Sequence, residues 1–112
     1  MKFAMLILGL LAFTSLGQFF EITNETGYDM YFVYISYASD GDWGSDWLGE
    51  DMFPDGETVV FNMDDYDWET ELFDIQLEDA DGDTYTFAGM DAEDYGTSED
   101  ENVFTVTLSD LD

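Results

Sequence analysis

Hydrophobic and polar residues alternate with a period of two along most of the chain after residue 18. This period is typical of β-strands whose two faces differ, and clusters of turn residues separate the runs. The pattern predicts strands over residues 19–23, 28–38, 58–63, 72–78, 83–88 and 102–109. Because the pattern indicates short strands and no long amphipathic helix, we expect an all-β fold, an antiparallel β-sandwich of six to seven strands.

The alternation also predicts which side chains form the core. The inward-facing set is Val59, Phe61, Met63, Phe73, Ile75, Leu77, Tyr85, Phe87, Phe104, Val106 and Leu108. The run 28–38 is apolar on both faces, with Met30, Phe32 and Tyr34 on one side and Val33 and Ile35 on the other. A strand of this kind is usually central or covers a second apolar cluster.

Turn residues define the connections. Asn24–Gly27, Pro54–Glu57 and Asp81–Gly82 read as turns, the last as a hairpin. A long loop follows residue 38, and acidic connections span 64–69 and 90–101. There is no internal repeat or linker in the sequence, so residues 18–112 are predicted to form a single domain.

The first seventeen residues have the pattern of a signal peptide. Lys2 precedes an apolar stretch from Phe3 to Phe13, and small residues follow up to Gly17. The stretch is far shorter than the roughly 20 residues that span a bilayer. We therefore expect cleavage after Gly17 and a secreted protein, extracellular or periplasmic; a lipid anchor would need Cys where Gln18 stands.

Charge changes the picture of possible partners. The chain has 28 Asp and Glu, one Lys or Arg and no His, and its net charge is −27. All the acidic residues follow residue 17, so the predicted mature domain carries −28. Nucleic acid and anionic membranes would repel such a domain. Cations, either diffuse or bound, must accompany the folding of the domain. Because the chain has no Cys and so no disulfide, bound divalent cations are the expected additional source of stability.

Two acidic loops are candidates for a metal site. If each strand crosses the sandwich, the loops 39–57 and 79–83 share one end, and hard oxygen ligands in flexible loops suit Ca²⁺. The predicted Ca²⁺ ligands are Asp40, Asp42, Asp46, Asp51, Asp79, Asp81 and Asp83. The hairpin departs from an EF-hand, since Thr84 and Met90 replace its Gly and Glu. The alternatives are a plain turn at Asp81–Gly82, a solvated loop, and the general acidity of a salt-loving source.

Enzymatic activity is disfavoured by the side chains available. Without His or Cys, and with its one Lys in the predicted signal peptide, the domain lacks the usual nucleophiles and bases. Two carboxylates could hydrolyse glycosides, but nothing in the sequence singles out a pair. We therefore expect that the protein is not an enzyme.

Several segments resemble a known family. The most specific is Trp43-Gly44-x-Asp46-x-Leu48-Gly49, and Asn24-x-Thr26-Gly27-Tyr28 and Asp81-Gly82-Asp83-Thr84-Tyr85 accompany it. Together they resemble a family of small secreted, uncharacterised bacterial β-domain proteins. The resemblance covers most of residues 18–112 and implies an exported β-domain, with no activity or site residue attached.

Three functions remain open from the sequence. The favoured one is a Ca²⁺-stabilised, non-enzymatic extracellular domain with a structural or adhesive role. The second is a carbohydrate-binding module in which Trp43, Trp47 or Trp68 stacks on sugar rings, although a loop Trp often caps a core instead. The third is an acidic decoy or inhibitor that captures a cationic protein.

Overall fold

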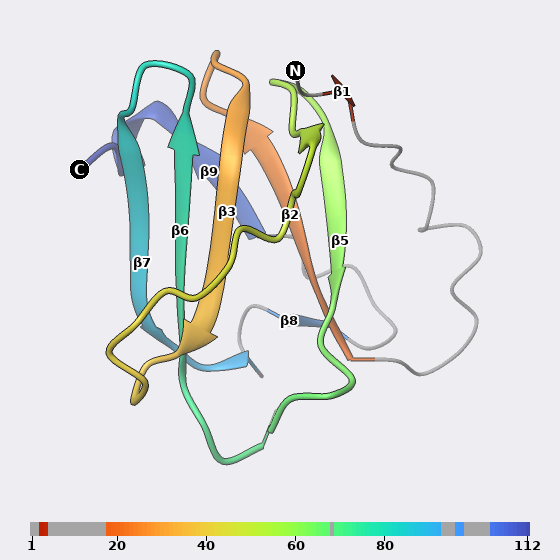
Figure 1. The fold of residues 1–112 in the computed structure, drawn as a ribbon, viewed down its shortest axis with the longest axis vertical. Coiled ribbons are helices and arrows are strands. Elements are labelled where there is room, and N and C mark those ends of the chain that lie inside the picture. Colours follow the sequence, from red (N-terminus) through yellow and green to blue (C-terminus); the bar gives the residue numbers. More distant parts are fainter. Residues whose placement is uncertain (1–2, 5–17, 68, 93–95, 98–103) are drawn as a thin grey trace.

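The computed structural model describes residues 3–4, 18–67, 69–92, 96–97 and 104–112 (Figure 1). Its elements are β1 (Phe3–Ala4), β2 (Phe19–Glu25), β3 (Met30–Tyr37), β4 (Asp51–Met52), β5 (Thr58–Asn62), β6 (Phe73–Asp79), β7 (Thr84–Met90), β8 (Gly96–Thr97), β9 (Phe104–Thr107) and a 3₁₀ helix, η1 (Leu108–Asp110). The strands predicted from the sequence are thus present within the described residues, with boundaries shifted by up to two residues. Residues 102–103 of the last predicted strand lie outside the described residues. The short strands β1, β4 and β8 were not predicted.

Two sheets pack face to face as a β-sandwich, which confirms the predicted fold class. One sheet has the order β3-β6-β7 and is antiparallel throughout. In the other, β2 pairs with β5 on one edge and with β8 and β9 on its other edge. The pairing of β2 with β9 is parallel, whereas the sequence predicted only antiparallel strands.

The core lies between the sheets and follows the alternation of each strand. Of the predicted inward-facing side chains, those of β5 to β7 and of β9 are buried apart from Phe87, which is partly buried against the core. Leu108 was also predicted to face inward, but it is 50% exposed. The reason is that the chain leaves the strand after Thr107 and turns into η1.

A β-bulge changes the faces of β3. The register with β6 shifts between Met30 and Phe32, and an inserted residue of this kind reverses the alternation on one side of it. Met30 is therefore buried on the core side with Val33 and Ile35, instead of sharing a face with Phe32 as predicted. The bulge leaves Phe32 and Tyr34 half-buried on the outer face of the sheet.

The segment 43–53 crosses the sandwich along the free edge of β3, which the sequence did not predict. Trp47 N donates to Val33 O at 2.7 Å, and Met30 and Phe53 exchange backbone hydrogen bonds of 2.8 and 2.9 Å. In Figure 1 this segment climbs from the lower loop to β4 at the top. The segment carries the chain once more from one end of the sandwich to the other. This additional crossing reverses the direction of the strands that follow, so β9 runs parallel to β2.

The extra crossing also moves the loops. The antiparallel register pairs Tyr37 with Phe73 and Met30 with Asp79, so the loop after β3 and the hairpin after β6 leave from opposite ends. The prediction that loops 39–57 and 79–83 share one end is therefore wrong for the first half of the longer loop. The turn after β2 and the point where the chain leaves β5 also lie at opposite ends of the sandwich (Figure 1).

The described N-terminal residues form a single short strand. β1 pairs in parallel with β4, joining Phe3 to Asp51 and Ala4 to Met52. It lies inside the segment where we predict a signal peptide, and that cleavage stays a prediction. Within the described ranges, no helix is long and apolar enough to cross a membrane.

Candidate functional site

A pocket of about 660 Å³ opens where the loop after β3 faces the connection after β5. The end of β3 supplies Ile35, Ser36 and Tyr37, and the loop supplies residues 40 and 42–47. Tyr66 completes the lining from the connection between β5 and β6. This volume is within the range of about 300–1,000 Å³ that is usual for sites of small ligands.

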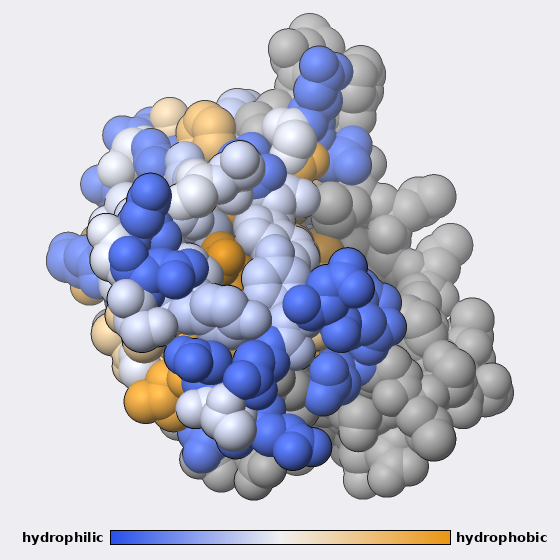
Figure 2. All heavy atoms as spheres, turned by 60° about the horizontal axis from the view of Figure 1, so that its bottom comes forward, coloured by the Kyte–Doolittle hydropathy of each residue, from blue (hydrophilic) through white to orange (hydrophobic). Residues whose placement is uncertain are grey.

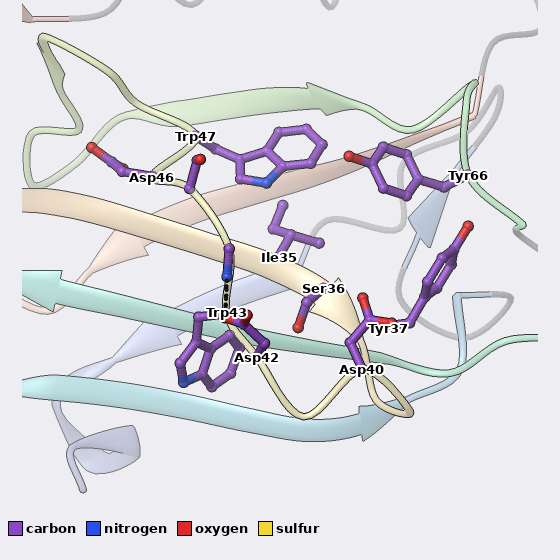
Figure 3. Close-up of a pocket in the computed structure, with 11 residues that line it drawn as sticks. Ile35, Ser36, Tyr37, Asp40, Asp42, Trp43, Asp46, Trp47 and Tyr66 are labelled. Carbon is purple, nitrogen blue, oxygen red and sulfur yellow. Dashed lines mark hydrogen bonds between the residues drawn. The ribbon is translucent and has the colours of Figure 1, made fainter.

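Aromatic rings form one wall of the pocket (Figure 3). Tyr66 lies between Trp47 and Tyr37, with ring centroids 5.7 and 5.8 Å away. Tyr37 also packs on Phe73 at 5.4 Å, and Trp47 meets Phe61 edge-on at 6.0 Å. Because Phe61 and Phe73 belong to the core, the wall is held in place before any ligand arrives. Trp47 thus fits the expected role of a core cap while keeping part of its surface in the pocket.

Trp43 lies on the other side of β3 from Trp47. Its ring packs on Tyr34 at 6.3 Å, and Tyr34 stacks on Phe32 at 6.3 Å with their planes 8° apart. These three rings form a row on the outer face of the sheet. Burial, together with the negative charges of Glu78 and Asp46, raises the pKa of Tyr34.

Carboxylates line the rest of the pocket. Asp40 and Asp42 are exposed, and Asp46 is half-buried. Asp42 Oδ1 accepts a hydrogen bond from Gly44 N at 3.1 Å, drawn as the dashed line in Figure 3. Figure 2 looks toward this end of the molecule, where hydrophilic side chains surround a paler, recessed area. The pocket therefore joins an aromatic wall to an acidic rim.

Asp46 has a structural task in this arrangement. Its Oδ1 accepts hydrogen bonds from Val33 N at 2.9 Å and Leu48 N at 3.0 Å. The carboxylate thus acts like the carbonyl of a neighbouring strand at the edge of β3. Gly44 and Gly49, with φ of +73° and +63°, supply the left-handed turns on either side. With Leu48 buried, the polar and glycine positions of the Trp-Gly-x-Asp-x-Leu-Gly segment are explained by folding.

Asn24 explains a second segment of the resemblance in the same way. This fully buried side chain donates from Nδ2 to Tyr28 O and Phe53 O, at 2.8 and 3.1 Å. Its Oδ1 accepts from the backbone and the hydroxyl of Thr26. It ties the turn after β2 to the end of the crossing segment, at the far end from the pocket.

The hairpin between β6 and β7 holds the second candidate site. Asp79, Asp81 and Asp83 each place a carboxylate oxygen within 4.8 Å of the others, and among the described residues this is the group of acidic side chains close enough for one cation. Asp79 is buried, whereas Asp81 and Asp83 are exposed. These three members of the predicted Ca²⁺ set are thus brought together.

Hydrogen bonds already surround the Asp79 carboxylate. Oδ1 accepts from Asp81 N and Asp83 N, both at 3.0 Å, and Oδ2 accepts from the Tyr85 hydroxyl at 3.2 Å. Burial of Tyr85 and its contact with Asp79 raise the pKa of this phenol to about 12. These three donors hold the Asp79 side chain in place, and through them the carboxylate shapes the hairpin.

The other predicted metal ligands lie elsewhere. Asp40 and Asp42 line the pocket at the opposite end, Asp46 holds the edge of β3, and Asp51 belongs to β4. The expected convergence of seven aspartates on one site is thus wrong, because the crossing segment separates the two halves of the loop. Trp68, one of the predicted sugar-stacking residues, lies outside the described residues.

Sequence reasoning identified the loop side of the pocket and missed the wall behind it. Trp43 and Trp47 were candidates for stacking on sugar rings in the second of the three functions, and both line the pocket. Tyr37 and Tyr66 were not singled out, because they lie far apart in the chain and meet only through packing. In comparisons with family models, curated proteins and solved structures, the chain has no significant match.

Proposed function

We propose that this chain is a secreted, non-enzymatic binding domain and that the pocket beside β3 receives its ligand. The observation that carries the proposal is the combination of a 660 Å³ hollow with an aromatic wall anchored on the core. Rings fixed in this way contact a ligand with little loss of side-chain entropy. Exposed carboxylates on the rim add hydrogen-bond acceptors that orient what binds.

The carboxylates of the pocket are poor candidates for catalysis. Glycoside hydrolysis requires one carboxyl group kept protonated by its surroundings and a second that is ionised. Asp40 and Asp42 are both exposed to water, and Asp46 uses one oxygen to accept two backbone amides. No imidazole or thiol is available anywhere in the sequence. Binding without turnover is the function that these side chains support.

Binding can be measured through the tryptophans of the pocket. A panel of neutral oligosaccharides and of short cationic peptides is titrated into the protein while tryptophan fluorescence and amide NMR shifts are recorded. We expect at least one class to saturate and to shift the amides of residues 35–47 and Tyr66. Replacing Tyr66 by Leu should weaken that binding about fivefold, because one stacked aromatic contact is worth about 1 kcal/mol. Absence of any saturable ligand in either class would contradict the proposal.

A second candidate function rests on the Asp79, Asp81 and Asp83 cluster. We propose that Ca²⁺ bound by these oxygens stabilises the hairpin end of the domain, in a structural or adhesive role. The cluster supplies three hard oxygen ligands in one tight turn, and Ca²⁺ takes six to eight oxygens in all, so carbonyl groups and water would supply the rest. Bound Ca²⁺ would also relieve the repulsion between the three negative charges.

Thermal melts test the Ca²⁺ proposal directly. The protein is melted in chelated low-salt buffer with Ca²⁺, Mg²⁺ or NaCl added at matched ionic strength. We expect Ca²⁺ to give a saturable stabilisation beyond the NaCl control, and Asp81→Asn to abolish the excess. Asp65→Asn removes the same charge at the opposite end of the sandwich and should leave the excess intact. Equal stabilisation by all three salts would mean that screening of the −27 charge is the whole effect.

A further inference from the structure

The pocket combines two features that both favour positive charge. The faces of Trp47, Tyr66 and Tyr37 attract cations through the ring quadrupole, and Asp40 and Asp42 stand beside them. In most proteins a nearby Lys or Arg would neutralise such carboxylates. Here the sequence contains one cationic side chain, at position 2, and no Arg or His. An incoming ligand is therefore the natural source of the missing positive charge.

We propose that the pocket binds an ammonium or guanidinium group, presented as a Lys or Arg side chain of a partner protein. This inference rests on the proposed function, since it names the ligand class of the same pocket. The apolar stem of the side chain lies along the aromatic wall, with Ile35 in the lining behind it. The charged head meets the acidic rim formed by Asp40 and Asp42.

Electrostatics favour this ligand over a neutral sugar. A sugar would gain stacking and hydrogen bonds, but nothing from the net charge of −27. A cationic group gains the same ring contacts, together with attraction to the rim and steering by the whole molecule. The negative electrostatic potential of the domain also disfavours acidic glycans as ligands of the pocket, since every carboxylate of the domain repels them.

The rings distinguish an organic cation from a metal ion. Ca²⁺ and Mg²⁺ select oxygen ligands and retain water, so they gain little from an aromatic wall. A guanidinium group is weakly hydrated and planar, and it both stacks on rings and pairs with carboxylates. The pocket is also larger than one such head group requires. It has room for the side chain and the adjoining backbone, which favours a protein segment over a free amine.

The test compares cationic ligands with neutral counterparts, in which citrulline keeps the shape of Arg and norleucine keeps the apolar stem of Lys. Blocked tripeptides with Arg or Lys at the centre are titrated by calorimetry and fluorescence, next to the same peptides with citrulline or norleucine. We expect the cationic peptides to bind at least tenfold more tightly than their neutral counterparts, and to weaken as salt rises. Arginine amide and lysine amide with acetylated α-amines, which keep only the side-chain charge, form a further arm. If they bind as tightly as the peptides, the ligand is a small amine and the partner-protein assignment is overturned.

Matched variants separate the contribution of the rim carboxylates to the affinity from the contribution of the overall net charge. The double variant Asp40→Asn/Asp42→Asn removes two charges at the pocket and should weaken the Arg peptide about tenfold. Glu25→Gln/Glu57→Gln removes two exposed charges at the other end and should change the affinity by twofold at most. Melting curves establish that both variants are folded. Equal losses in the two variants would overturn the inference, because attraction would then come from the net charge alone.

The outcomes also separate this inference from the proposed function. If a neutral oligosaccharide binds and the Arg peptide does not, the pocket is a binding site but its ligand class is wrong. If no ligand of any class saturates, both proposals fail. Binding of citrulline as tightly as arginine would remove the role of charge and leave only the aromatic wall.

Discussion

The carboxylate of Asp46 offers the sharpest test of how this fold is held together. Replacing Asp46 by Ala removes the acceptor that serves the backbone amides of Val33 and Leu48. Val33 is fully buried, and its amide lies at the edge of β3, where the crossing segment takes the place of a neighbouring strand. The perturbation therefore leaves a polar group of the sheet without its partner.

The magnitude follows from the two hydrogen bonds. Each bond to an ionised acceptor is worth about 1.5–3 kcal/mol, and the half-exposed position of Asp46 lowers that value through screening. We expect Asp46→Ala to cost about 2–3 kcal/mol of unfolding free energy, or roughly 10–20 °C in the melting temperature of a domain this small. Asp46→Asn keeps a carbonyl oxygen as acceptor and should cost about 1 kcal/mol.

Urea unfolding at neutral pH, followed by tryptophan fluorescence, measures both effects. Asp65→Ala is the matched control, because it removes the same charge from an exposed position. A cost for Asp46→Ala within about 0.5 kcal/mol of that control would refute the reasoning. The Asp46 variants also separate folding from metal binding. Since Asp46 lies outside the Asp79 cluster, its Asn variant should keep any Ca²⁺ affinity unchanged.

Three further predictions concern buried polar groups. Asn24→Ala removes four hydrogen bonds from a buried site, and we expect a loss of about 3–5 kcal/mol in urea unfolding. Burial raises the pKa of Glu21 in the folded protein above 4.5, because the ionised carboxylate is poorly solvated there. The free energy of unfolding therefore falls as the pH rises through this folded-state pKa and the group ionises. Glu21→Gln should therefore stabilise the domain at pH 7 but have little effect at pH 4, as melts at both values will show. Tyr85 should titrate near its pKa of about 12 in ultraviolet absorbance, and Asp79→Asn should lower that value.

The strands could be predicted from the sequence because each carries its own alternation. Phe73, Ile75 and Leu77 show a clean period of two, and the Asp81-Gly82 pair marks the hairpin that follows. The core therefore follows from local information. The bulge at Met30 could not be predicted, since a single inserted residue leaves both faces of β3 apolar and gives no signal in the pattern.

The candidate sites depended on the path of the chain. The crossing segment has few backbone pairs and no alternation of apolar and polar residues, so the sequence predicted a loop there. Because one crossing of the sandwich was missed, the later loops were assigned to the wrong ends. That error placed Asp40 and Asp42 beside Asp79 when they line a pocket at the other end. Asp79, Asp81 and Asp83 lie within one local turn, so the sequence could place their carboxylates close together, while their binding of Ca²⁺ stays a prediction. The wall of Tyr37 and Tyr66 exists only in the folded chain.

The parallel pairing of β2 with β9 has a consequence for how the protein is made. β2 is the first long strand to leave the ribosome, yet one of its edges is completed by residues 104–107, near the end of the chain. Until those residues are available, a strand rich in buried side chains has an open edge, which is the usual starting point of aggregation. The same chains repel one another through their many carboxylates. The same negative charges that repel one another within the folded domain thus oppose aggregation of incomplete chains until β9 can pair with β2.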